Sequence, residues 1–99
     1  MTEERRSHER FEARLRVKWD GISGLQEARL DDISLGGCFV NTRTRVDIGE
    51  LITLEIELAN GEWLPLPGEV TSFQPGIGFG LAFVLVTDED EFILRNLLG

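Results

Sequence analysis

Apolar and polar positions alternate along most of the chain with a period of two, which is typical of strands that bury one face. The clearest alternation runs from Leu51 to Leu58, where Thr or Glu separates the apolar residues. A similar alternation begins at Phe11 and leads to Trp19. Further strands are predicted over residues 25–30, 38–42, 62–73 and 78–86. The pattern therefore predicts six strands.

Turn residues separate the predicted strands. Residues 20–24 (Asp-Gly-Ile-Ser-Gly) join the first two strands, residues 60–61 (Asn-Gly) give a strong hairpin signal, and residues 74–76 (Gln-Pro-Gly) precede the last strand. Pro65 and Pro67 stand inside a predicted strand, where proline indicates an edge position, a bend or a bulge.

The end of the chain follows a helical period instead. Asp88 with Glu91 resembles a capping box, and apolar residues follow at helical spacing, so we expect a short amphipathic helix from about residue 88. This helix either covers the barrel or packs on a partner. The connections are too short for parallel crossovers, and a closed barrel leaves no exposed edge. We therefore expect a mainly all-β fold, a small six-stranded antiparallel β-barrel with a short C-terminal α-helix.

Length and charge restrict the function. The 99 residues fit one domain, and the formal net charge of −8 opposes DNA or RNA as a partner, since such binding draws on phosphate neutralisation. No apolar run reaches the about 20 residues of a membrane span, and no secretory signal is visible, so we expect a cytoplasmic protein. The single Cys38 excludes an intramolecular disulfide and is expected to be a small buried residue.

The basic residues are unevenly distributed. Residues 1–18 hold six of the ten Lys and Arg, whereas the rest of the chain has four basic and fourteen acidic residues, a balance of −10. An arginine-rich segment in an acidic protein indicates either a local anion site or a solvated terminus.

Arg5, Arg6 and Arg10 form the first candidate motif. Guanidinium groups bind phosphates bidentately, contact purine edges and stack on purine faces. His8 lies among them, but no second His, Cys pair or carboxylate cluster accompanies it, so we expect it to be solvated and predict neither a metal site nor a catalytic base.

The segment Asp32-Ile33-Ser34-Leu35-Gly36-Gly37 forms the second motif, an Asp-x-Ser-x-x-Gly loop. A carboxylate can accept hydrogen bonds from the N–H edge of a guanine, and a hydroxyl with open glycine backbone can complete an anion cradle. By itself the loop could also be a simple Asx or Ser/Thr turn, with Gly36 and Gly37 supplying positive φ. Together with the arginines, it predicts a site for a small anionic ligand that carries guanine.

The order and separation of these motifs resemble those of the PilZ domain, a family of bacterial receptors for the second messenger cyclic di-GMP. The matching residues are Arg6, Arg10, Asp32, Ser34 and Gly37, followed by Gly-x-Gly-Leu-x-Phe at residues 78–83. The resemblance covers nearly the whole chain, from about residue 4 to residue 98.

The resemblance implies a site residue by residue. Arg6 and Arg10 would hold phosphates and guanine rings, Asp32 would bind the Watson–Crick edge of a guanine with help from Ser34, and Gly37 would let the backbone turn close to the nucleotide. Arg5, directly before the motif, is compatible with an intercalated ligand pair rather than a single molecule. Where many relatives carry Trp or Arg near the last turn, this chain has Phe73, which either stacks on a base or belongs to the core.

The resemblance also implies an organisation and a function. Residues 1–10 would be an arginine-bearing arm that changes conformation over the ligand, and residues 11–99 a single barrel domain. We expect a non-enzymatic receptor that needs no cofactor and signals to a separate, unidentified protein or through a homodimer. The alternative is a PilZ-like module that acts through protein contacts alone and does not bind nucleotide.

Overall fold

The computed structural model describes residues 11–21 and 24–98, and for residues 11–13 only the backbone. The strands are β1 (Phe11–Gly21), β2 (Gly24–Ile33), β3 (Gly37–Asn41), β4 (Leu51–Glu57), β5 (Trp63–Gln74) and β6 (Gly78–Phe83), and the helix is α1 (Asp88–Leu98). The prediction of a mainly β fold with one C-terminal helix is confirmed.

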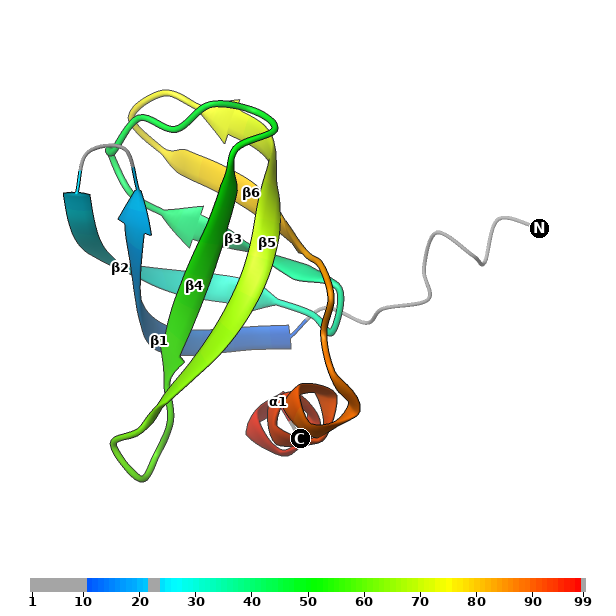
Figure 1. The fold of residues 1–99 in the computed structure, drawn as a ribbon. Coiled ribbons are helices and arrows are strands. Elements are labelled where there is room, and N and C mark those ends of the chain that lie inside the picture. Colours follow the sequence, from blue (N-terminus) through cyan, green and yellow to red (C-terminus); the bar gives the residue numbers. More distant parts are fainter. Residues whose placement is uncertain (1–10, 22–23, 99) are drawn as a thin grey trace.

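The strands form one closed barrel in the order β1-β2-β3-β6-β5-β4, with antiparallel pairing throughout. The barrel closes where β1 pairs with β4, for example at Val17 opposite Ile56. Figure 1 shows the strands wrapped around a common interior and α1 at one end. The predicted six-stranded antiparallel barrel is therefore confirmed.

The interior is filled by the apolar residues of the alternating pattern. On β4, Ile52, Leu54 and Ile56 are buried, while the residues between them face outward. Trp19 is buried against Phe79, with ring centroids 5.4 Å apart and an interplanar angle of 76°. This edge-to-face contact is a favourable aromatic geometry.

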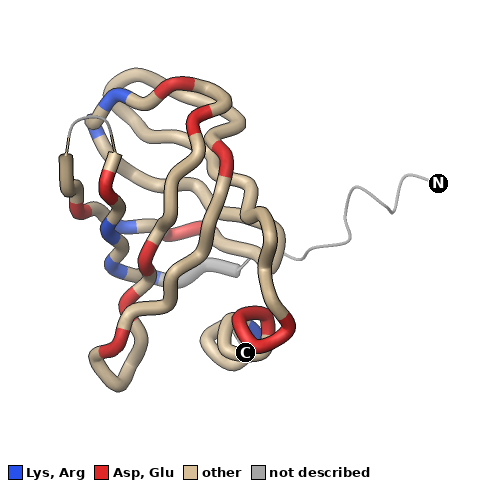
Figure 2. Tube along the Cα trace, viewed as in Figure 1, with Lys and Arg blue, Asp and Glu red and all other residues tan. Residues whose placement is uncertain are grey.

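Charged side chains on the outer surface pair across the strands that close the barrel. Lys18 lies 3.7 Å from Glu55, and its Nζ is 4.3 Å from the centroid of the half-buried Trp63 ring. Arg16 lies 3.3 Å from Glu57 on the same face. Figure 2 shows basic residues on β1 and acidic residues along β4 and β5, so the two signs meet at this seam.

The helix α1 closes one end of the barrel. Leu94 is fully buried in the core, and Ile93 and Leu97 pack against it, so the helix covers the barrel. The cap is one residue earlier than predicted, because Thr87 Oγ1, and not a group of Asp88, accepts a hydrogen bond from the Asp90 N–H at 3.0 Å. Threonine is a preferred N-cap residue.

Several predicted boundaries shift for local reasons. β6 ends at Phe83 rather than at residue 86, because Leu85 has a φ of +55°, which no strand residue adopts. The hairpin between β4 and β5 is present, and the Leu58 N–H donates to the Glu62 carbonyl at 2.7 Å, which closes a loop of three residues, 59–61. The Gly61 N–H donates to the Leu58 carbonyl at 2.9 Å, and Gly61 alone takes the left-handed conformation, with a φ of +88°.

Pro65 and Pro67 lie in the half of β5 that has β4 as its partner, because β6 pairs with β5 only from Gly68 onward. Proline has no N–H to donate to a ladder, so this stretch with one neighbouring strand accommodates both rings. Among the described residues, no helix is long and apolar enough to cross a membrane.

Candidate ligand-binding site

The Asp-x-Ser-x-x-Gly motif lies where β2 turns into β3. Asp32 is the penultimate residue of β2, residues 34–36 form the turn, and Gly37 is the first residue of β3. The prediction that the whole motif is a loop is therefore wrong for Asp32 and Gly37. Asp32 is a strand residue because β2 and β3 keep pairing as far as Ile33 and Cys38, and Gly37 is one because it pairs with Ala82 of β6.

Ser34 holds the turn together through its backbone and its side chain. Its N–H donates to the Gly37 carbonyl at 2.8 Å, and its hydroxyl donates to the same carbonyl at 3.3 Å. The Gly36 N–H in turn donates to Ser34 Oγ at 3.1 Å. With a residue exposure of 7%, Ser34 is the only buried polar residue in the described part of the chain. The Ser/Thr turn considered from the sequence is thus present, and its hydroxyl has a structural role.

Gly37 is required by a close approach of two backbones. It pairs with Ala82 of β6, and an added Cβ would overlap the carbonyl oxygen of Leu81. Neither Gly36 nor Gly37 has a positive φ, so that part of the simple-turn interpretation is wrong. The Gly36 carbonyl accepts a hydrogen bond from the Phe83 N–H at 2.9 Å, which ties the turn to the end of β6.

Asp32 is half-buried and directly follows a point of β2 where the pairing with both neighbouring strands is irregular. The β2–β3 register shifts between Leu30 and Asp32, and the β1–β2 register shifts between Glu12 and Leu15. Bulges of this kind change the direction in which a side chain points and are common beside binding sites. Asp32 itself stands opposite Glu12 on β1 and Phe39 on β3.

The start of β1 lies beside this turn. Phe11 pairs with Ile33, the residue between Asp32 and Ser34 in the chain. Arg5, Arg6, His8 and Arg10 lie outside the described residues. The structure thus brings Asp32, Ser34, Gly36 and Gly37 together next to the strand that follows the arginines, and it leaves the contacts of the arginines themselves untested.

Phe73 does not join this group. It is half-buried, packs against the core and pairs with Phe79, which in turn pairs with Val40. The turn is at the other end of β3, where Gly37 pairs with Ala82. The core interpretation of Phe73 is therefore the better one. Cys38 is buried, as expected.

The contact that sequence reasoning missed is the hydrogen bond between Gly36 and Phe83. It joins two backbone groups 47 positions apart, and backbone groups carry no residue-specific signal. Within residues 11–21 and 24–98, no cluster of three or more His, Cys, Asp or Glu is arranged to hold a metal ion.

Comparison with known proteins identifies related domains. A family model, the PilZ domain, matches residues 4–99. The PilZ domain of YcgR from Escherichia coli, solved with c-di-GMP, superposes with a TM-score of 0.77 at 17% identity, covering 95% of this chain and 88% of that one. No curated protein sequence gives a significant match.

Two longer structures share the fold. YcgR from Escherichia coli in complex with c-di-GMP has a TM-score of 0.76 at 18% identity, covering 93% of this chain and 43% of that one. The Bacillus subtilis inhibitor of motility, MotI/DgrA, has a TM-score of 0.77 at 19% identity, covering 95% of this chain and 49% of that one. The present chain therefore spans less than half the length of either protein.

Proposed function

Because the chain belongs to the PilZ domain family, we propose that it is a receptor for cyclic di-GMP. Two of the similar structures, both of YcgR, were solved with this ligand. The proposal assigns this chain a binding function and no catalytic step. It also places the protein in the bacterial cytoplasm.

The observation that carries the proposal is the pairing of Phe11 with Ile33. Arg10 directly precedes Phe11 in the sequence, and consecutive Cα atoms are about 3.8 Å apart. The arginine segment therefore leads directly into a residue that pairs beside Asp32 and the Ser34 turn. This connection supports a single site built from both motifs.

The chemistry of the two motifs is complementary to the ligand. Cyclic di-GMP presents two phosphates and two guanines, and arginine suits both groups, because its planar fork binds phosphate oxygens or guanine O6 and N7 bidentately. In the proposed site, Arg6 and Arg10 bind phosphates and guanine rings. Asp32 accepts hydrogen bonds from the guanine N1–H and N2–H, which adenine does not offer as a pair.

The buried Ser34 and the half-buried Gly37 have a supporting role in this site. The Ser34 hydroxyl fixes the turn, and Gly37 allows the backbone to pass close to β6, so both residues hold the turn in place beside Asp32. Arg5 adds a cation that would help a second, intercalated ligand molecule to bind.

We propose further that ligand binding orders residues 1–10 as an arm over the barrel and that a separate protein recognises the changed surface. Ordering a segment on binding consumes part of the interaction free energy and limits the affinity. Self-association as a homodimer is the other route for the signal. Both remain predictions.

Isothermal titration calorimetry with cyclic di-GMP tests the receptor function. Arg6→Ala removes a charged hydrogen-bonding partner and is expected to lower the affinity roughly 10- to 150-fold, corresponding to about 1.5–3 kcal/mol. Arg45→Ala is the matched control. It removes the same charge from the exposed β3–β4 connection and should leave the affinity unchanged.

Cyclic di-AMP and GTP serve as ligand controls in the same titrations. Saturable binding of cyclic di-GMP, and of neither control ligand, supports the receptor function. The molar ratio at saturation shows whether one ligand molecule or two bind to each chain. Absence of heat at millimolar cyclic di-GMP, with the chain shown to be folded, contradicts the proposal and favours a module that acts through protein contacts.

A further inference from the structure

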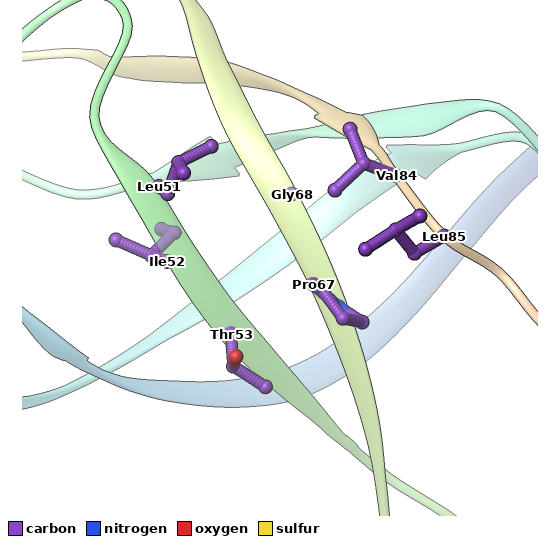
Figure 3. Close-up of a pocket in the computed structure, with 7 residues that line it drawn as sticks. All are labelled: Leu51, Ile52, Thr53, Pro67, Gly68, Val84 and Leu85. Atoms are coloured by element: carbon purple, nitrogen blue, oxygen red, sulfur yellow. The ribbon is translucent and has the colours of Figure 1, made fainter.

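A small apolar groove lies on the outer surface of β4 and β5. It has a volume of about 200 Å³ and is lined by Leu51, Ile52, Thr53, Pro67, Gly68, Val84 and Leu85. Figure 3 shows Leu51 and Thr53 on β4, Pro67 on β5, and Val84 with Leu85 on the segment after β6. We call this surface the β4–β5 groove.

Leu85 is held in an unusual position at the rim of this groove. The residue is 87% exposed, and its φ of +55° lies in a region that non-glycine residues with large side chains rarely adopt. The Val84 N–H donates to the Pro67 carbonyl at 2.8 Å, which fixes the preceding residue against β5. Leu51, on the opposite rim, is 72% exposed. Two leucines therefore flank an apolar depression open to solvent.

Acidic residues stand beside the groove on β5 and at the start of α1. Between Arg45 and Arg95 the chain contains ten acidic residues and no Lys, Arg or His. Ion pairs with residues outside this stretch involve Glu55, Glu57 and Glu91, whose partners are Lys18, Arg16 and Arg95. Glu69 is exposed and stands directly opposite Leu51 in the β4–β5 ladder. The first turn of α1, three residues after Leu85, is entirely acidic.

We propose that the β4–β5 groove docks a segment of a partner protein in which one large apolar side chain is flanked by Lys or Arg. The groove is smaller than the about 300–1,000 Å³ of small-molecule pockets and suits a single side chain. The carboxylates of Glu69, Asp88 and Glu89, all exposed, attract flanking cations and speed association.

A second copy of this chain is the less favourable occupant. A twofold interface would place the groove against itself, so that Glu69 and the α1 carboxylates of both copies would meet, and like charges across an interface are costly. The proposal rests on the proposed function in one respect only, which is that an adaptor needs a partner protein. The groove is formed without the Asp32 site or the arginines.

The test uses the full chain as bait for a displayed library of random 12-residue peptides, with and without cyclic di-GMP. Leu85→Gly is the first variant, because glycine adopts the positive φ without strain and the rim leucine is lost. Leu51→Thr is the second variant, since it removes the other rim leucine and keeps a strand-forming residue. Leu25→Thr is the matched control, because Leu25 is also an exposed strand leucine but lies on β2.

The expected result is enrichment of peptides with an apolar residue between Lys or Arg. Their affinity for Leu85→Gly and Leu51→Thr should fall at least fivefold, as for loss of an anchoring contact, and Leu25→Thr should bind like wild type. Amide signals of Thr53, Gly68 and Val84 should shift in NMR spectra of the peptide complex.

Three outcomes overturn the proposal: no enriched peptide, acidic or purely polar peptides, or enriched peptides that bind both groove variants as tightly as wild type. Dimerisation of the free chain that Leu85→Gly abolishes would assign the groove to a second copy instead. Because the Arg6→Ala titration concerns a different surface, loss of cyclic di-GMP binding with groove binding retained would contradict only the receptor function.

Discussion

Gly37 begins β3 at a point where the backbones of β3 and β6 almost touch. The residue type is therefore dictated by the carbonyl of Leu81 and not by a special dihedral angle. Ser34 has a comparable structural role, because its hydroxyl both accepts and donates within the turn. Two motif residues assigned to a ligand from the sequence thus also stabilise the barrel.

Gly37→Ala should destabilise the fold. The added methyl group meets backbone that cannot rotate away, so β3 and β6 must separate, at a cost of about 1–3 kcal/mol in the free energy of unfolding. Gly80→Ala is the matched control, since its Cβ would meet mainly the hydroxyl of the exposed Ser72, which can move. Urea denaturation measures both, and equal midpoints for the two variants would contradict this explanation.

Ser34→Ala should lower stability even without ligand. Each hydrogen bond contributes about 0.5–1.5 kcal/mol net, so loss of the two side-chain bonds should reduce the free energy of unfolding by about 1–3 kcal/mol. Ser72→Ala, at an exposed site on β5, should have little effect. Unchanged thermal stability of Ser34→Ala would show that the turn does not depend on its hydroxyl.

The residue types of the candidate site could be predicted from the sequence, but the structural reasons for some of these residue types could not. The separation of Asp32, Ser34 and Gly37 is visible in the chain, whereas the overlap of a Gly37 side chain with Leu81 depends on the β3–β6 register. The positive φ of Leu85 was equally unpredictable, because leucine carries no preference for that conformation.

At the scale of elements, strand alternation predicted the barrel because each strand has one face in the core and one in solvent. The residues at which the strands end depended on pairing between segments that are distant in the sequence. β2 continues through Asp32 because β3 pairs with it that far. The cap of α1 is Thr87, although Asp88 is an equally good capping residue, since one-residue shifts at a helix start lie beyond sequence patterns.

The helix should be part of the cooperative unit of the barrel. Leu94→Ala leaves a cavity in the core and should cost about 2–5 kcal/mol of unfolding free energy, with a single transition. Phe92→Ala, on the same helix but 66% exposed, should change it by less than about 0.5 kcal/mol. Denaturant melts followed by far-UV circular dichroism and by the fluorescence of Trp19 and Trp63 would contradict this if the two probes disagreed.

At the scale of the whole molecule, the fold was predictable because short connections exclude parallel crossovers and closure leaves no free edge. The distribution of charge was only partly predictable. The chain shows its arginine-rich start, but folding decides that Arg16 and Lys18 are paired with Glu57 and Glu55 at the β1–β4 seam. The position of the exposed Glu69 beside the β4–β5 groove also follows from the strand order.

If the receptor function is correct, cyclic di-GMP should stabilise the whole domain. At 100 times the dissociation constant a ligand contributes about 2.7 kcal/mol, which for a chain of this size raises Tm by about 10–20 °C. Differential scanning calorimetry should show this rise for wild type and Arg45→Ala and a much smaller rise for Arg6→Ala at the same ligand concentration. An equal rise with cyclic di-AMP would contradict guanine recognition.

Because Cys38 is buried, the rate at which a thiol reagent modifies it measures the opening of the barrel. It is the only thiol in the chain, lies inside the barrel on β3 and stands across from Ile33, the residue that anchors the first strand. A thiol reagent can reach the sulfur only when strands separate, so the rate of its modification reports how often the barrel opens. Any ligand that secures the start of β1 should slow the modification of Cys38, and no cysteine has to be introduced to measure it.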